Sequence, residues 1–190
     1  MLQELFIEPC CYQRQLSQII AELEDACSGR TSATFFSSGD WDLSTLLTFM
    51  AWQVPDSVIT LALHTVDQKT LCAIDRLLAT YRDNGNQLVN HFTLITCTAK
   101  QRLKTIRDNL DRWGDDRLTV VQDNTEIRCL TLRNVSRQFV ITGSMNQYPR
   151  YAKQMYTISA DLMTYFDTQQ VLDSITRLGN LKNKWRKIYT

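Results

Sequence analysis

The residues best suited to chemistry in this chain follow a predicted buried strand, 138–142. The strand passes directly into Gly143 and Ser144, and Asn146 lies two residues further on. In α/β proteins, the turns at the carboxyl ends of strands usually hold the binding and catalytic side chains. This turn is therefore the first place where we expect a site.

A second polar turn follows another predicted strand, 32–36, and leads into a predicted helix. Polar residues from the two turns could together hold a phosphate or another anion, with helix N-terminal amides contributing. They are Ser37, Ser38, Asp40, Ser144, Asn146 and Arg150. Turn formation and helix capping alone explain residues 37–40. A GSxN turn is not needed to end a strand, so Ser144 and Asn146 keep both a structural and a functional interpretation.

Two other side chains could react. His64 ends a predicted strand and could act as a general acid or base, although a structural histidine is the favoured interpretation because it has no recognisable partner in the sequence. Cys129 could form a thiolate beside Arg133, but packing in the core is favoured for it as well. Alternation along its strand places Cys129 on one face with Thr131 and Arg133, and these two residues could face the anion pocket beside Gly143 and Ser144. Scattered histidines and cysteines offer no metal ligand set, and no cofactor is expected.

The elements that must position these residues follow an α/β order. Stretches with helical spacing alternate with short continuous apolar runs, which suit strands covered on both faces. Four helices are predicted. The first spans 12–27, the second is capped by Ser38 or Asp40 and ends before Pro55, the third begins near 67 and has Tyr81 on its buried stripe, and the fourth spans 101–113 and is closed by Gly114. The strands predicted between them are 32–36, 58–63 and 92–97.

After residue 116 the pattern changes. The strand-like runs 118–121, 126–132 and 138–142 leave no room for a helix between them, which predicts an antiparallel or mixed portion. A strand, 154–158, and a helix starting near Ser159 follow. The residues predicted on the buried side of that helix are Leu162, Phe166, Leu172 and Ile175. The expected fold class is α/β, with a mixed β-sheet sandwiched by helices.

Composition indicates one globular domain over 1–190, with an N-terminal helical segment, 1–30, and a basic tail, 177–190. The chain has 190 residues, is 44% apolar and carries a net charge of +1, so its overall charge does not drive it onto nucleic acid or an anionic membrane. The basic tail is first of all a solvated helix end. Its interleaved Trp185 leaves nucleic-acid binding open as an alternative.

The cysteines and the N-terminus point to the cytoplasm. Six cysteines occur without a CxxC pair, which favours a reducing compartment. The apolar run in MLQELFIEPCC is too short for a signal peptide or a membrane span and has acids where a signal peptide would have bases. No membrane association is expected.

The GSxN turn after a predicted β-hairpin resembles the phospholipase D-like superfamily, whose signature is HxKxxxxDxxxxxxGSxN. A narrower resemblance is to small single-motif members carried by phages and mobile elements. It rests on an SG-x-WDL-like turn at 38–43, an SMN-x-x-PR segment at 144–150 and a YTIS strand at 156–159. The resemblance implies a histidine nucleophile, a lysine that neutralises the phosphate, and a homodimer that pairs two motifs.

Counting back from Gly143 by the signature spacing shows that the expected chemistry is missing. Cys129 stands at the histidine position, Thr131 at the lysine position and Ser136 at the aspartate position. Shifting the alignment by one residue in the hairpin turn does not place a histidine at that position. The resemblance therefore implies a catalytically degenerate domain of a prophage or mobile element that serves binding or assembly. The alternatives are an active phosphodiesterase or nuclease that uses Cys129 or His64, and a non-catalytic nucleic-acid-binding protein.

Overall fold

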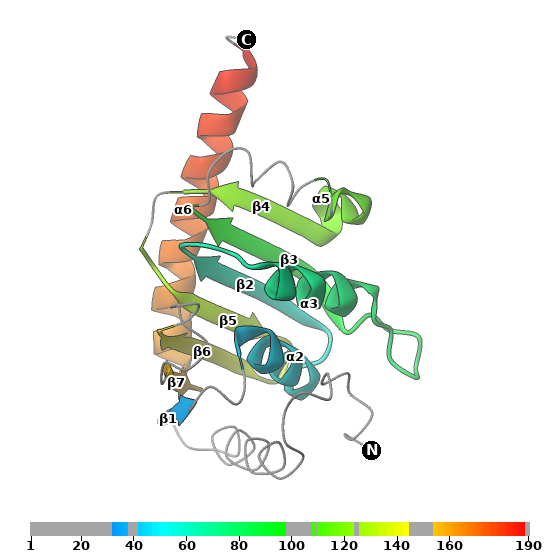
Figure 1. Ribbon diagram of the computed structural model, residues 1–190, viewed down its shortest axis with the longest axis vertical. Coiled ribbons are helices and arrows are strands. Elements are labelled where there is room, and N and C mark those ends of the chain that lie inside the picture. The colour runs from blue at the N-terminus through cyan, green and yellow to red at the C-terminus, as the bar shows by residue number, and fades with distance from the viewer. Residues whose placement is uncertain are drawn as a thin grey trace.

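The computed structural model describes residues 32–37, 42–97, 108, 110–123, 126–144 and 154–188 (Figure 1). Its centre is a seven-stranded sheet with the strand order β1-β7-β6-β5-β2-β3-β4. The strands are β1 (Ser32–Ser37), β2 (Ser57–Leu63), β3 (Val89–Thr96), β4 (Leu118–Gln122), β5 (Cys129–Arg133), β6 (Gln138–Gly143) and β7 (Gln154–Ser159). The helical elements are α2 (Leu43–Gln53), α3 (Gln68–Ala79), the 3₁₀ turn η2 (Asp111–Trp113), α5 (Gly114–Arg117) and α6 (Leu162–Ile188).

The expected fold class is confirmed, because helices cover both faces of a mixed sheet. α2 and α3 lie on one face and α6 lies on the other (Figure 1). Side chains of β2 show how one strand serves both layers: Ile59 and Leu61 join the larger core beneath α2 and α3, and Ala62 joins a smaller core with Leu172 of α6. A continuous apolar run is what a strand buried in this way needs.

The partners of two strands differ from the sequence prediction. β4, expected in the antiparallel portion, pairs in parallel with β3 and ends the sheet order. β1, expected to begin the first of three βα units, lies at the opposite edge and pairs antiparallel with β7. The β5–β6 hairpin is confirmed. A local apolar pattern indicates that a strand forms, but it carries no information on which neighbour it takes.

The buried side of α6 agrees with the prediction in part. Leu172 is buried and Ile175 packs against the same core, as predicted, but Leu162 and Phe166 are 47% and 44% exposed. Among the described residues of the helix, Tyr165, Leu172 and Gly179 are buried. These three residues recur every seven positions, and a Cβ on Gly179 would meet the side chain of Val121 in β4. The helix thus presses its glycine against the last strand of the sheet. In a similar way Tyr81, expected on the buried stripe of α3, lies beyond that helix and is exposed.

Some predicted elements fall outside the described residues. This holds for the helix over 12–27 and for most of the helix over 101–113. Gly114 adopts a left-handed φ of 66° and leads into α5 rather than ending all helical structure. Among the described helices, none is long and apolar enough to cross a membrane.

Candidate functional site at the carboxyl edge of the sheet

Strand direction brings the predicted reactive positions to one edge of the sheet. β2 and β6 run the same way on either side of the antiparallel β5, so the ends of β2 and β6 meet the start of β5. The register pairs Cys129 with Ala62 on one side and with Thr142 on the other. His64 and Ser144 follow strands two spacings apart, which corresponds to about 10 Å. We define this row of strand ends as the carboxyl edge.

Gly143 and Ser144 are both used by the sheet itself. A Cβ on Gly143 would meet the carbonyl oxygen of Met155 and would lie 3.1 Å from the Cα of Tyr156. The Ser144 N–H donates to the Met155 carbonyl at 3.1 Å, and the Ser144 hydroxyl accepts a hydrogen bond from the Met155 N–H at 3.0 Å. Serine thus extends the β6–β7 ladder by one step. The hydroxyl has a structural role that needs no ligand.

The other predicted ligands of this pocket lie outside the described residues. They are Ser38, Asp40, Asn146 and Arg150. Their part in an anion site stays a prediction.

β5 turns Cys129, Thr131 and Arg133 to one face, as the alternation predicts, and that face is covered by α6. Cys129 packs in the core cluster that contains Leu172, and the Thr131 hydroxyl donates to Oε1 of Gln169 at 2.9 Å. The Arg133 guanidinium lies 5.1 Å from the ring centre of Phe166 and 5.7 Å from that of Tyr165. Only Arg133 of the three is exposed.

Burial also decides the chemistry of Cys129. Its side chain is 2% exposed, and burial raises the pKa of the thiol to about 12. A thiol with such a pKa stays protonated at neutral pH, while the nucleophile is the thiolate. The surroundings of Cys129 therefore disfavour covalent catalysis by this residue.

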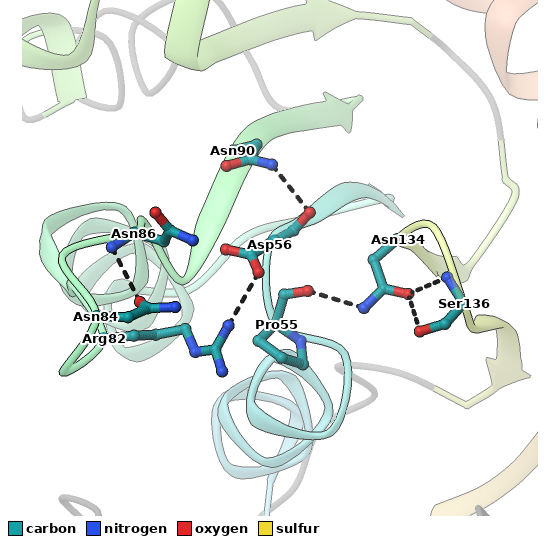
Figure 2. A network of polar contacts seen from close by, with 8 residues as sticks. All are labelled: Pro55, Asp56, Arg82, Asn84, Asn86, Asn90, Asn134 and Ser136. Carbon is teal, nitrogen blue, oxygen red and sulfur yellow. Dashed lines mark hydrogen bonds and ion pairs between the residues drawn. The ribbon is translucent and has the colours of Figure 1, made fainter.

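The aspartate position of the signature is Ser136, which Figure 2 shows beside Asn134 in the β5–β6 turn. This turn follows the end of β5, whereas the carboxyl edge lies at its start. The N–H and hydroxyl of Ser136 donate to Oδ1 of Asn134, at 2.9 and 3.1 Å. The Asn134 amide in turn donates to the Pro55 carbonyl at 2.8 Å, just before β2 begins. Nearby, Asp56 pairs with Arg82 at 2.9 Å. Ser136 is therefore part of a hydrogen-bond network that connects the β5–β6 turn to the segment before β2.

The two histidines have different surroundings. His91 is structural: one ring nitrogen lies 2.9 Å from the Asp116 carbonyl and the other 3.2 Å from the Thr119 hydroxyl. His64 is exposed at the carboxyl edge, and its backbone carbonyl accepts a hydrogen bond from the Thr96 hydroxyl. Within the described ranges, no group of three or more His, Cys, Asp or Glu side chains could hold a metal ion.

The structure brings together a polar cluster that sequence reasoning missed. Asp42 caps α2 by accepting hydrogen bonds from the Thr45 N–H at 3.1 Å and from the Ser44 hydroxyl, and Lys69 lies 3.7 Å from its carboxylate. Tyr156 is fully buried, and burial and the charge of Asp42 both raise the pKa of its phenol. Tyr156 also pairs with Gly143.

Three segments far apart in the sequence thus converge on this cluster. Asp42 belongs to the SG-x-WDL-like turn, Tyr156 begins the YTIS strand and Gly143 opens the GSxN turn. The signal that could have identified Asp42 is its position as an N-cap directly before an apolar helical stripe. No local signal marks Tyr156, because only the fold brings its phenol within reach of the Asp42 charge.

Asp42→Asn is expected to reduce the sensitivity of the fold to acid. Burial alone would raise the pKa of the Asp42 carboxyl, but hydrogen bonds from Ser44 and Thr45 and the charge of Lys69 outweigh it, so its pKa is lowered. A lowered pKa adds stability that is present above the unfolded value, about 3.9, and is lost as the pH falls through the folded value. Asparagine keeps the cap and lacks the titration.

The measurement is urea unfolding of the wild type and of Asp42→Asn between about pH 5 and pH 2, the range in which such carboxylates titrate. The free energy of unfolding of the variant should fall less over this range. Asp42→Ala is the control for the cap and should cost about 0.5 to 2 kcal/mol at neutral pH. Equal pH slopes for wild type and Asp42→Asn would contradict the argument.

Comparison with known proteins shows the fold. No family model matches the sequence, and no curated protein does. Among solved structures, the polyphosphate kinase of Porphyromonas gingivalis is similar with a TM-score of 0.56 and 11% identity. The likeness covers 86% of this chain but only 28% of the kinase chain, so the chain spans well under a third of that protein. At this identity the match supports the mixed α/β fold and nothing more specific.

TrmBL2, an archaeal chromatin protein whose structure is described as showing a novel mode of DNA binding, is also similar. Its TM-score is 0.46 and its identity 15%, over 85% of this chain and 59% of that protein.

Proposed function

We propose that this chain is a catalytically degenerate phospholipase D-like domain that acts as a binding or assembly module. The observation that carries the proposal is the pair Cys129 and Thr131 at the histidine and lysine positions, both buried beneath α6. The chemistry implied by the resemblance needs an imidazole that attacks phosphorus and an ammonium that neutralises its oxygens. A protonated thiol and a hydroxyl bonded to Gln169 supply neither.

The contacts of the remaining motif residues support the same proposal. Gly143 and Ser144 are engaged with Met155 in the β6–β7 ladder, and Ser136 is engaged with Asn134. Each contact serves the frame of the fold. Such a frame persists if the protein still has to bind or assemble, because both need a defined surface but neither needs a nucleophile.

The proposal extends to a homodimer in the cytoplasm and to an origin in a prophage or mobile element. The homodimer and the origin follow from the resemblance at 38–43, 144–150 and 156–159. The cytoplasm is supported by cysteine usage, since the six cysteines include no CxxC pair.

Purified protein is expected to show no turnover of single- or double-stranded DNA, RNA or a generic phosphodiester such as bis(p-nitrophenyl) phosphate. Cys129→Ala and His64→Ala should behave like the wild type in the same assays. Any trace activity that survives both substitutions points to a contaminant. Turnover that either substitution abolishes would overturn the proposal and establish the rearranged phosphodiesterase site instead.

A further inference from the structure

α6 continues past the last strand of the sheet. Gly179 marks the point where the helix meets β4, because it is buried and a Cβ there would meet Val121. Since β4 ends the sheet order, the helical residues 180–188 extend beyond it (Figure 1). At a rise of about 1.5 Å per residue they add roughly 13 Å. A helix that leaves its sheet in this way has no described strand beneath it.

One side of α6 exposes apolar residues in the turns before this extension, residues 180–188. Val171 and Leu178 are 48% and 56% exposed and lie seven positions apart, which places them on the same side of the helix. In the sequence, Trp185 continues this spacing, and leucine and isoleucine at 181 and 188 follow the companion spacing of a heptad. A heptad of apolar residues is typical of a helix that packs against another helix. We define Val171 and Leu178, the described residues of this spacing, as the outer seam.

Charge is divided sharply along α6. Residues 162–176 contain Asp167 and Asp173 and no Lys or Arg, whereas residues 177–188 contain five Lys or Arg and no acid. Two such helices packed in parallel would place the Lys and Arg residues of one beside those of the other, where like charges repel. In the antiparallel orientation, the basic half of each lies toward the acidic half of the other. A lone helix also favours this division because of its dipole. The exposed side chains of Val171 and Leu178 therefore identify the contact surface, and the charge division gives the orientation.

We propose that the outer seam binds the outer seam of a second copy of this chain, with the two α6 helices antiparallel. The proposal deepens the assembly role given above by naming its partner and surface, and it does not depend on the loss of catalysis. A second copy fits better than nucleic acid, because the exposed aliphatic side chains of Val171 and Leu178 offer nothing to a phosphate backbone. This arrangement takes the place of the dimer that the resemblance implies, in which two GSxN turns are paired.

The test is the solution mass of the full chain by sedimentation equilibrium across a wide concentration range. The wild type is expected to dimerise, and Val171→Asp with Leu178→Asp should weaken the dimer by about tenfold or more. Both side chains are half-exposed, so the circular dichroism of the variant should match that of the wild type. Thermal unfolding should match at concentrations low enough for the wild type to be monomeric, since dimerisation itself raises the apparent stability. Leu162→Asp is the matched control. This residue is 47% exposed but lies nine positions before Val171, on the opposite side of α6.

Charge reversal tests the orientation. Asp167→Lys with Asp173→Lys places basic residues in both halves of α6 and should also weaken the dimer, with an effect that shrinks at high salt. An effect of Leu162→Asp equal to that of the seam variant would count against the seam.

Four further outcomes would overturn the proposal. The first is a wild type that stays monomeric, as it would if another segment of the chain covers the seam. The second is a dimer that the seam variant leaves intact, which would point to pairing at the carboxyl edge. The third is a dimer that strengthens on reversal of Asp167 and Asp173, and the fourth is association seen only with added nucleic acid. None of these bears on the absence of turnover, which the phosphodiester assays test separately.

Discussion

Gly143→Ala is expected to lower the free energy of unfolding by about 3 kcal/mol or more, at the upper end of single substitutions. An added Cβ would meet the backbone carbonyl of Met155 and press on the Cα of Tyr156. These are main-chain atoms within a sheet, so they cannot rotate away as the tip of a side chain can. The β6–β7 pairing would have to separate at its last step. Urea unfolding at neutral pH measures the loss.

Gly85→Ala is the matched control for backbone conformation. Gly85 has a φ of 80°, and no atom lies within 4 Å of the position of its Cβ. Its substitution should therefore cost only the left-handed penalty of about 1 to 2 kcal/mol. A Gly143→Ala protein as stable as the Gly85→Ala protein would mean that the sheet does not require this glycine. The GSxN turn would then be better explained by close approach of a ligand.

Thr131→Lys, which restores the lysine of the signature, is expected to destabilise the protein by about 3 to 5 kcal/mol, the usual cost of an uncompensated buried charge. Thr131 is 1% exposed and sits beneath Gln169 of α6. No described carboxylate bonds to Thr131, and Asp173 already accepts a hydrogen bond from the Gln169 amide at 2.8 Å. Chemical unfolding of the single variant measures the cost.

Thr131→Val separates charge from shape. Valine keeps the volume of threonine and loses one hydrogen bond, so the expected cost is about 1 kcal/mol. The double variant Cys129→His with Thr131→Lys should gain no phosphodiester turnover, because α6 still covers both positions. A stable Thr131→Lys protein would show that α6 can move off this face. Turnover by the double variant would show in addition that a phosphodiesterase site can form at these positions.

α6 links the two proposals made for this chain. Its inner side covers the positions at which the signature places its reactive residues, through Gln169 and Leu172. Another side leaves Val171 and Leu178 exposed. A helix that covers Cys129 and Thr131 and presents an apolar seam is better suited to assembly than to turnover.

Most elements of the fold could be predicted from the sequence, because each depends on neighbours close in the chain. The apolar run before His64 predicts a buried strand, and the polar turn near Ser136 predicts the hairpin. The common face of Cys129, Thr131 and Arg133 follows from strand alternation alone. The predicted strand over 126–132 contains Cys129 and Thr131, and the structure places both in β5.

The tertiary structure alone decided what those elements contact. Strand partners for β1 and β4, the buried side of α6 and the coupling of Asp42 to Tyr156 all join residues distant in sequence. Local periodicity cannot supply such information, since the same apolar stripe can pack on several neighbours. The sequence by itself determined that residues 129 and 131 lack an imidazole and an ammonium. The fold decided that both are buried beneath α6, because long-range packing determines which face of a sheet meets water.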